Sequence, residues 1–521
     1  MKTKRQYLYN ALLLTAVALI MRTVSVSFNV YVSNRVGAEA MGLLALISSV
    51  YGFSVTLATS GIHLATVRTV AARLERTKGA ENGRVLRACL AYAAFFGTLA
   101  FALLFLLAKP LGLYVLKDAR TVRALRLLAL TLPPIALTSV LNGYFTAVRR
   151  AWKNALAQVT EQGVKISLTT YLLVIAAPKT VEGCVLAILT GGAVSESLSL
   201  LLNLILYLFD RRHFKGVLPA KGGPKISVAA IALPVAVSAY ARSGLVAIEH
   251  ILIPRGLIAF GAGNSEALAA YGTLQSMALP VVLYPAAILS SFAALLIPEI
   301  TEQQSADNRV EIRYIAGRVY QMTLLFAIGT AGVMLSLSGE LGGVLYGNAE
   351  AAGFIRALAP LVPIMYLDTA TDAMLKGMGE QVYTMNVNIL DAFLSVVAVA
   401  LLVPRMGIAG YLVTIYFTEL LNAALSVARL LKVTGFSPSV FALVLRPLLA
   451  VIGATSLNRL LVAFAPVALQ SPVARLVLHI LTAVLLYAAL LFATGGFARR
   501  DLRWLINLVK PTKATPAAAE K

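Results

Sequence analysis

The chain has 521 residues, of which 59% are hydrophobic and only 13% are charged, whereas soluble domains carry about 25% charged residues. Together with a mean hydropathy of +0.82, this composition excludes a soluble globular domain, a disordered chain and a secreted disulfide scaffold. Cys89 and Cys184 lie far apart and provide neither a disulfide framework nor a metal-ligand spacing. We therefore expect no metal site and no cofactor.

Apolar runs recur along the chain from Leu8 to about Thr494. A run of about 20 apolar residues crosses a hydrocarbon core about 30 Å thick as a helix. The first run continues past Arg22 to about Val32, so we interpret it as an uncleaved first helix rather than a signal peptide. The sequence predicts an all-α, polytopic membrane protein with about fourteen spans, at 8–32, 41–70, 85–108, 122–147, 155–177, 184–209, 226–253, 267–297, 314–337, 354–375, 383–403, 409–430, 440–463 and 474–494.

The net charge of +22 follows the loops between these spans. Sixteen Lys and Arg residues lie in segments 1–6, 73–87, 149–153 and 210–225, whereas the three intervening loops carry six. Because short cytoplasmic loops are enriched in Lys and Arg, both termini are predicted to lie in the cytoplasm, with the protein in the cell membrane. This topology accounts for the basic residues without a nucleic-acid partner.

A weak internal repeat divides the chain. Arg123-Ala-Leu and Arg356-Ala-Leu each precede a proline-bearing span and then a glycine, Gly143 or Gly377. The predicted organisation is two pseudo-symmetric six-helix lobes plus two C-terminal helices. Its parts are the N-terminal lobe 1–209, an inter-lobe loop 210–225, the C-terminal lobe 226–432, helices 13 and 14 in 433–494, and an amphipathic cytoplasmic tail 495–521.

Three stretches resemble a known family. Gly61-Ile-His-Leu-Ala-Thr-Val-Arg resembles the end of the second helix in the stage V sporulation protein B family. Residues 142–162 are similar to that family's connection between helices 4 and 5, and Leu375-Lys-Gly-Met-Gly-Glu-Gln is the counterpart in the second half. The family belongs to the multidrug/oligosaccharidyl-lipid/polysaccharide exporter superfamily, which includes lipid II flippases. The resemblance implies two lobes around a central cavity and alternating access for a lipid-linked sugar.

Ionisable residues within spans are costly, by about 2.5–3.5 kcal/mol each, and usually face a protein interior or an aqueous cavity. For each one here, a buried structural ion pair and a functional role remain open. Glu161 and Lys165 have the favourable i,i+4 order of a structural pair. The other candidates for structural or coupling ion pairs are Glu196, Asp368, Asp372, Lys376 and Glu419. Asp368 and Asp372 repel each other unless one is protonated or a cation such as Lys376 lies between them.

Arg22 and Arg242 stand in the first helix of each predicted lobe. The resemblance implies that this helix lines the central cavity, where arginine can form bidentate bonds to phosphate. Lipid II flippases carry a cavity arginine in a context that Arg22 resembles, but the second arginine of their first helix is replaced here by Phe28. The cavity candidates are therefore Arg22, Arg242, Glu249 and Asp391.

The sequence thus predicts a flippase, not an enzyme, for an undecaprenyl-diphosphate-linked oligosaccharide or peptidoglycan precursor. Its partners would be the lipid-linked sugar, membrane lipids and a coupling ion or the membrane potential. A multidrug or cation antiporter of the same superfamily is the alternative, although Arg22 gives the first helix a cation where that activity favours an acid. A membrane polymerase or acyltransferase is a third alternative, which the short outer loops disfavour.

Overall fold

The computed structural model describes residues 2–77, 82–175, 178–211, 228–436, 439, 441–464, 471–497 and 501. Most of the predicted inter-lobe loop and of the C-terminal tail therefore lies outside the described residues. The described residues form helices and turns, with no strand among them. The predicted all-α membrane architecture is confirmed.

Most helices follow the predicted apolar runs, but the run predicted as one span at 267–297 is divided into three helices. They are α1 (Lys2–Thr59), α2 (Ile62–Thr77), α3 (Asn82–Pro110), α4 (Thr121–Ala129), α5 (Leu132–Ala147), α6 (Ala151–Ile175), α7 (Val181–Arg211), α8 (Val228–Phe260), α9 (Asn264–Gly272), α10 (Leu279–Leu283), α11 (Ala286–Ser305), α12 (Arg309–Tyr346), α13 (Ala349–Leu358), α14 (Val362–Gly377), α15 (Gln381–Met406), α16 (Ile408–Thr434), α17 (Arg446–Phe464) and α18 (Pro472–Ala493). Among the described residues, ten helical segments are long and apolar enough to cross a membrane, or eleven if α4 and α5 form one bent span. The exact number of fourteen spans stays a prediction.

Breaks in the helices coincide with glycine and proline. α1 is two helices joined at Gly37, whose φ of 82° suits a residue without a side chain, and this break lies between the first two predicted spans. α4 and α5 meet at a bend of 41° just before Pro133 and Pro134. α13 and α14 are likewise separated by a short 3₁₀ turn that contains Pro360. The two segments that the sequence repeat matches are thus both interrupted next to proline.

By contacts, the chain divides into two compact units that do not follow chain order. Unit 1 comprises Met1–Arg22, Val281–Thr384 and Glu419–Lys521, and unit 2 comprises Thr23–Pro280 and Met385–Thr418. These units group residues by contact and not by repeat, so the two-lobe division at 209–226 stays a prediction.

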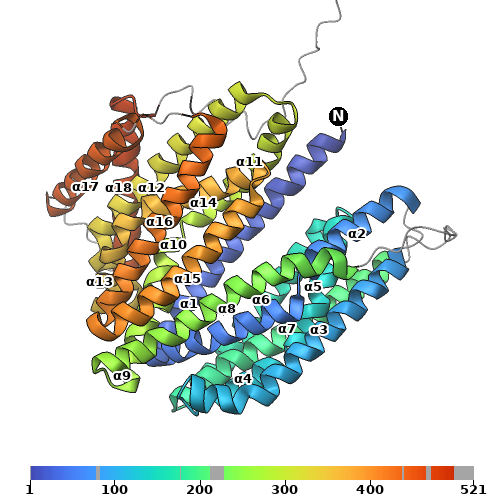
Figure 1. Ribbon diagram of the computed structural model, residues 1–521. Helices are drawn as coiled ribbons and strands as arrows, with labels where there is room; N and C mark the ends of the chain where they lie inside the picture. Colours follow the sequence, from blue (N-terminus) through green and yellow to red (C-terminus); the bar gives the residue numbers. More distant parts are fainter. Residues whose placement is uncertain are drawn as a thin grey trace, which may run out of the picture. The chain divides into compact units, whose positions relative to one another are not determined.

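In unit 1, α12 runs beside α11, α14, α17 and α18 (Figure 1). Its buried side chains, such as Val319 and Tyr320, pack against Met374 and Leu375 of α14. The Tyr320 hydroxyl pairs with that of Thr371 at 3.1 Å, which satisfies both groups inside this core. α12 therefore forms the centre of unit 1.

In unit 2, α6 packs along α7, and α3 packs along α5 (Figure 1). α1 approaches α9 so closely that a Cβ atom on Gly42 would overlap the carbonyl of Leu268. Gly272 faces Gly42 across the same contact. Small residues bring helix backbones together in membranes, where van der Waals packing replaces the hydrophobic effect.

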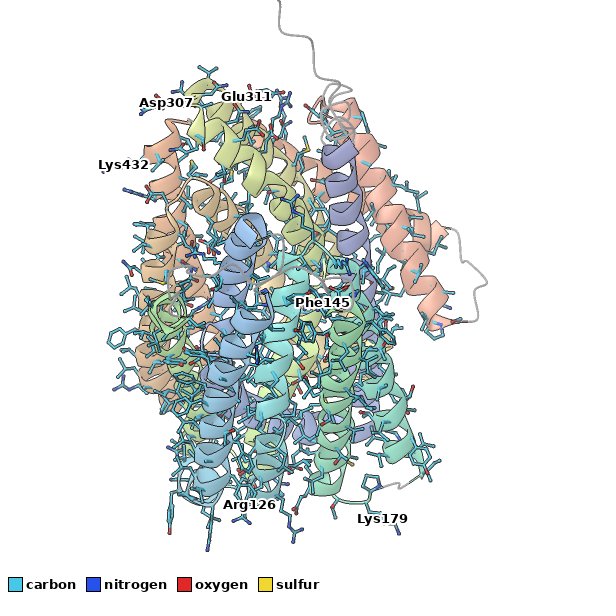
Figure 2. All side chains as sticks on the ribbon, turned by 90° about the vertical axis from the view of Figure 1, so that its right-hand side faces the viewer. Arg126, Phe145, Lys179, Asp307, Glu311 and Lys432 are labelled. Carbon is cyan, nitrogen blue, oxygen red and sulfur yellow. The ribbon has the colours of Figure 1, made fainter. Side chains whose placement is uncertain are left out.

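Figure 2 places Arg126 and Lys179 at one end of unit 2. It also places Asp307, Glu311 and Lys432 at one end of unit 1. Charged residues therefore mark the ends of the helices within each unit, as expected for side chains at a membrane surface.

Candidate functional site

The acidic residues Glu249 and Asp391 come together in unit 2, on α8 and α15. Ser395 and Asp391 of α15 both lie close to the Glu249 carboxylate, and Asp391 is close enough to repel it electrostatically. Asp391 and Ser395 are one turn apart on α15, so both face α8. Two predicted candidates from separate spans thus share one site.

Arg242 completes this group. It stands two turns before Glu249 on α8, and its guanidinium interacts attractively with Asp391. Arg242 is exposed, whereas Glu249 and Asp391 are half-buried. The group, which we call the acidic site, contains Arg242, Glu249, Asp391 and Ser395, and carries two carboxylates for one arginine.

Two tyrosines enclose the acidic site. Tyr271 of α9 and Tyr411 of α16 are buried, and both lie within electrostatic range of Glu249. The Tyr271 hydroxyl pairs with Nδ1 of His250 at 2.9 Å. The surroundings of Glu249 therefore combine aromatic rings with few polar partners, which strengthens electrostatic interactions there.

A second group in unit 2 joins α6 and α7. Ser199 lies close to Glu161, and Lys165 attracts both Glu161 and Glu196. Glu161 and Glu196 repel each other across the two helices. The predicted Glu161–Lys165 pair is therefore part of a larger arrangement in which one lysine serves two carboxylates.

The candidates of α14 make separate contacts in unit 1. Asn422 of α16 donates to Asp368 at 3.3 Å. Lys376 pairs with Asp372 at 3.4 Å, the arrangement that the spacing of these two residues suggested. Glu419 lies on α16, one turn before Asn422. A local ion pair and an amide thus accompany the two aspartates.

Arg22, the other predicted cavity arginine, is exposed on α1. It lies at the boundary where unit 1 ends and unit 2 begins along the chain. Its exposure leaves the guanidinium accessible to a ligand.

Sequence reasoning missed two ionic clusters at the ends of the helices. The Asp210 carboxylate of α7 is fully buried and pairs with Lys153 at 2.6 Å and with Arg150. Burial and the neighbouring Arg150 hold the pKa of Lys153 below its usual range. The available signal was the pair of basic residues Arg150 and Lys153 and an acid at a helix end, but the sequence separation of 57 between Lys153 and Asp210 concealed it.

The second missed cluster lies at the other end of unit 2. Arg120 donates to Asp118 and, at 2.8 Å, to Glu39, while the Ser265 hydroxyl donates to Glu39 at 2.6 Å. The hydrogen bonds to Asp118 are the main cause of a raised pKa at Arg120. This cluster ties the loop before α4 to the break in α1 and to the start of α9.

Comparison with known proteins identifies related chains. A family model described as "Polysaccharide biosynthesis protein" matches residues 7–253. Stage V sporulation protein B of Bacillus subtilis (strain 168) is 25% identical over 442 residues, which cover 83% of this chain and 85% of that protein. The resemblance to the sporulation protein family is therefore confirmed.

Solved structures show the same fold. The lipid II flippase MurJ, in its inward closed conformation, has a TM-score of 0.69 at 12% identity and covers 94% of this chain and 100% of its own. An inward-facing multidrug resistance MATE transporter of the MOP superfamily has a TM-score of 0.62 at 15% identity, with 81% and 100% covered. The protein is accordingly a multi-pass membrane protein with the fold of this transporter superfamily.

Proposed function

We propose that the protein is a flippase that moves an undecaprenyl-diphosphate-linked oligosaccharide or peptidoglycan precursor across the cytoplasmic membrane by alternating access. The observation that carries the proposal is the extent of the likeness to the lipid II flippase, which covers 94% of this chain. The multidrug transporter covers 81%. The polysaccharide biosynthesis family model supports a cargo that contains sugar.

The cargo has two ends, and the chain offers partners for its charged part. A diphosphate needs cationic donors inside a membrane protein, and the planar guanidinium binds phosphate oxygens in a bidentate manner. Arg22 and Arg242 are both exposed and both belong to apolar spans. We assign each of them, in its own unit, as a cationic anchor for a diphosphate.

The acidic site supplies the coupling. With both Glu249 and Asp391 ionised, its two carboxylates exceed the single charge of Arg242, and a low-dielectric surrounding makes that excess costly. A proton or a monovalent cation bound there would restore neutrality, so its binding and release would link cargo movement to an ion gradient or the membrane potential. Glu161 and Glu196, which share Lys165, are a second group of the same kind.

A flipping assay in proteoliposomes tests the cargo. We expect transbilayer movement of lipid II or of a second undecaprenyl-diphosphate oligosaccharide, and no stimulated efflux of an organic cation. Efflux of the cation without movement of either lipid would favour the antiporter alternative and refute the flippase.

The variant Glu249→Gln tests the coupling. It keeps a hydrogen-bonding partner for Ser395 but removes the ionisable group, so flipping should lose its dependence on the proton or sodium gradient while the protein stays folded. The matched control is Glu182→Gln, because Glu182 is also in unit 2 but pairs with the exposed Arg123 at 3.4 Å. An unchanged gradient dependence in Glu249→Gln would refute the role of the acidic site.

A further inference from the structure

A cavity of about 630 Å³ opens at the first turns of α12 in unit 1. Volumes between about 300 and 1,000 Å³ are typical of small-molecule sites. The cavity is lined by Arg313, Tyr314, Arg318 and Gln321 on α12, and by Gly435 and Phe436 just after α16. Figure 2 shows Asp307, Glu311 and Lys432 at the same end of unit 1. The cavity therefore lies where α12 begins and α16 ends.

Two guanidinium groups line the cavity. Arg318 pairs with the buried Asp501, donates to the Tyr314 hydroxyl at 3.2 Å and to Gln321 at 3.2 Å, and lies over the Tyr314 ring. These contacts fix Arg318 in one orientation, and its positive charge is balanced by Asp501. Arg313 adds a second positive charge and is exposed to solvent.

Two glycines keep the cavity open beside Arg313. A Cβ atom on Gly435 would lie 3.1 Å from the Arg313 guanidinium, and one on Gly317 would lie 3.0 Å from the Phe436 ring. Gly435 also has a φ of +63°, which disfavours other residues. Larger side chains at either position would crowd the wall next to the exposed guanidinium.

The remaining lining is apolar or aromatic. Val310, 79% exposed, and Tyr314, 45% exposed, form the rim, and Phe436 forms part of the wall. α12 is long and apolar enough to span a membrane, and its charged first turns precede the apolar run predicted at 314–337, so we place these turns at the level of the lipid headgroups. Basic pockets between membrane helices at this depth suit anionic headgroups.

We propose that this cavity binds the phosphate of an anionic phospholipid headgroup, with Arg313 and Arg318 as the donors and the apolar rim against the glycerol and upper acyl carbons. Arginine forms charge-assisted hydrogen bonds to phosphate in this manner. The bound lipid is a resident of the site and not the transported cargo. The proposal is therefore independent of the proposed flippase activity.

Native mass spectrometry of the full chain in detergent measures this binding directly. The three probes are short-chain phosphatidylglycerol, short-chain phosphatidylcholine and inorganic phosphate. We expect phosphatidylglycerol to bind in preference to the other two, and Arg313→Gln to weaken its binding about tenfold, as the loss of a charge-assisted hydrogen bond implies. The matched control is Arg309→Gln. Arg309 lies on the same helix and is also exposed, but it pairs with Asp307 and does not line the cavity.

A second variant adds a negative charge without touching the arginines. Val310→Glu should repel the lipid phosphate, whereas Val382→Glu, at another exposed valine at a helix start in unit 1, should leave binding unchanged. Equal binding by the two arginine variants, or by the two valine variants, would overturn the proposal. Equal binding of phosphatidylcholine, or of inorganic phosphate, would also overturn it, the latter by identifying a free-phosphate site.

Discussion

Glu249 and Asp391 illustrate what individual residues contribute to the acidic site. Ser395 provides a neutral hydroxyl near Glu249, whereas Arg242 provides a charge near Asp391. The two acids therefore differ in how their ionised forms are stabilised, although both belong to membrane spans. From this difference we propose the ion-dependent role for Glu249 and the positioning of Arg242 for Asp391.

Replacing Arg242 separates a cargo anchor from a structural partner. Since Arg242 balances the charge of Asp391, we expect Arg242→Ala to lower the free energy of unfolding and the addition of Asp391→Asn to restore it. Flipping should fall at least about tenfold because a charge-assisted contact to the diphosphate is lost. Transport and melting temperature are measured in one preparation, with the exposed Arg123→Ala as the control.

The double variant decides between the two roles of Arg242. If the arginine served only to balance Asp391, adding Asp391→Asn would restore transport. A restored rate in Arg242→Ala/Asp391→Asn would contradict the anchor assignment.

Arg22 is the corresponding residue in the first helix. Its exposure leads us to expect that Arg22→Ala abolishes flipping while expression and melting temperature stay nearly unchanged. Arg22→Lys should be impaired as well, because an ammonium group cannot reproduce the planar fork. A large fall in melting temperature that a second substitution at Glu249 or Asp391 rescues would instead identify a buried ion pair, whose disruption costs about 3–5 kcal/mol.

The sequence located every acid of the acidic site but not the partnerships among them. Hydropathy identifies a charge within an apolar run, so Glu249, Asp391 and Arg242 were visible as costly residues. Ser395 and Tyr411 carry no such signal, because serine and tyrosine are ordinary in membrane helices. Their role depends on which helices are neighbours, and that is decided by tertiary packing.

At the scale of helices, local chemistry predicts more. Apolar length gave the positions of the spans, and the breaks at Gly37 and before Pro133 follow from backbone preferences. The region 267–297 was predicted as one span but consists of α9, α10 and α11, with a π-helical turn at Thr273–Ala278. Pro280 and Pro285 explain that interruption, since proline removes a backbone donor and disturbs the preceding turn.

The contact between α1 and α9 depends on glycine. Gly42→Ala should lower the free energy of unfolding by about 1–3 kcal/mol, because the added methyl overlaps the Leu268 carbonyl and forces the helices apart. Thermal unfolding in detergent measures the change. The control is Gly52→Ala on the same helix, where an added Cβ has no atom within 4 Å.

The glycine control also has a defined sign. Gly52→Ala should be neutral or stabilising, because alanine favours the helix by about 1 kcal/mol over glycine. Equal destabilisation by both substitutions would show that the α1–α9 contact does not depend on the small side chain.

For the whole molecule, the distribution of charge predicts the membrane topology, and the internal repeat predicts the division into two lobes. Lys and Arg are concentrated in the loops on one side, and the charge of each loop can be counted from its own short stretch of sequence. The repeat depends on scattered matches such as Arg123 and Arg356. The contact-based units do not follow the repeat, because they group α8 with the first half of the chain. Both stay predictions, and topology is the one to test first because cysteine labelling measures it directly.

Cysteine labelling tests this topology on the full chain. Cys89 and Cys184 are the native cysteines, so Cys89→Ser/Cys184→Ser provides the background. Single cysteines at Lys4 and Lys513 should resist a membrane-impermeant maleimide in intact cells and react after permeabilisation, because sixteen basic residues against six place both ends in the cytoplasm. A cysteine at Lys179, in a predicted outer loop and at one end of unit 2 in Figure 2, is the positive control and should react in intact cells. Labelling of the cysteine at position 4 or 513 from outside intact cells would contradict the predicted orientation. It would also reverse the direction in which the proposed flippase presents Arg22 and Arg242 to its cargo.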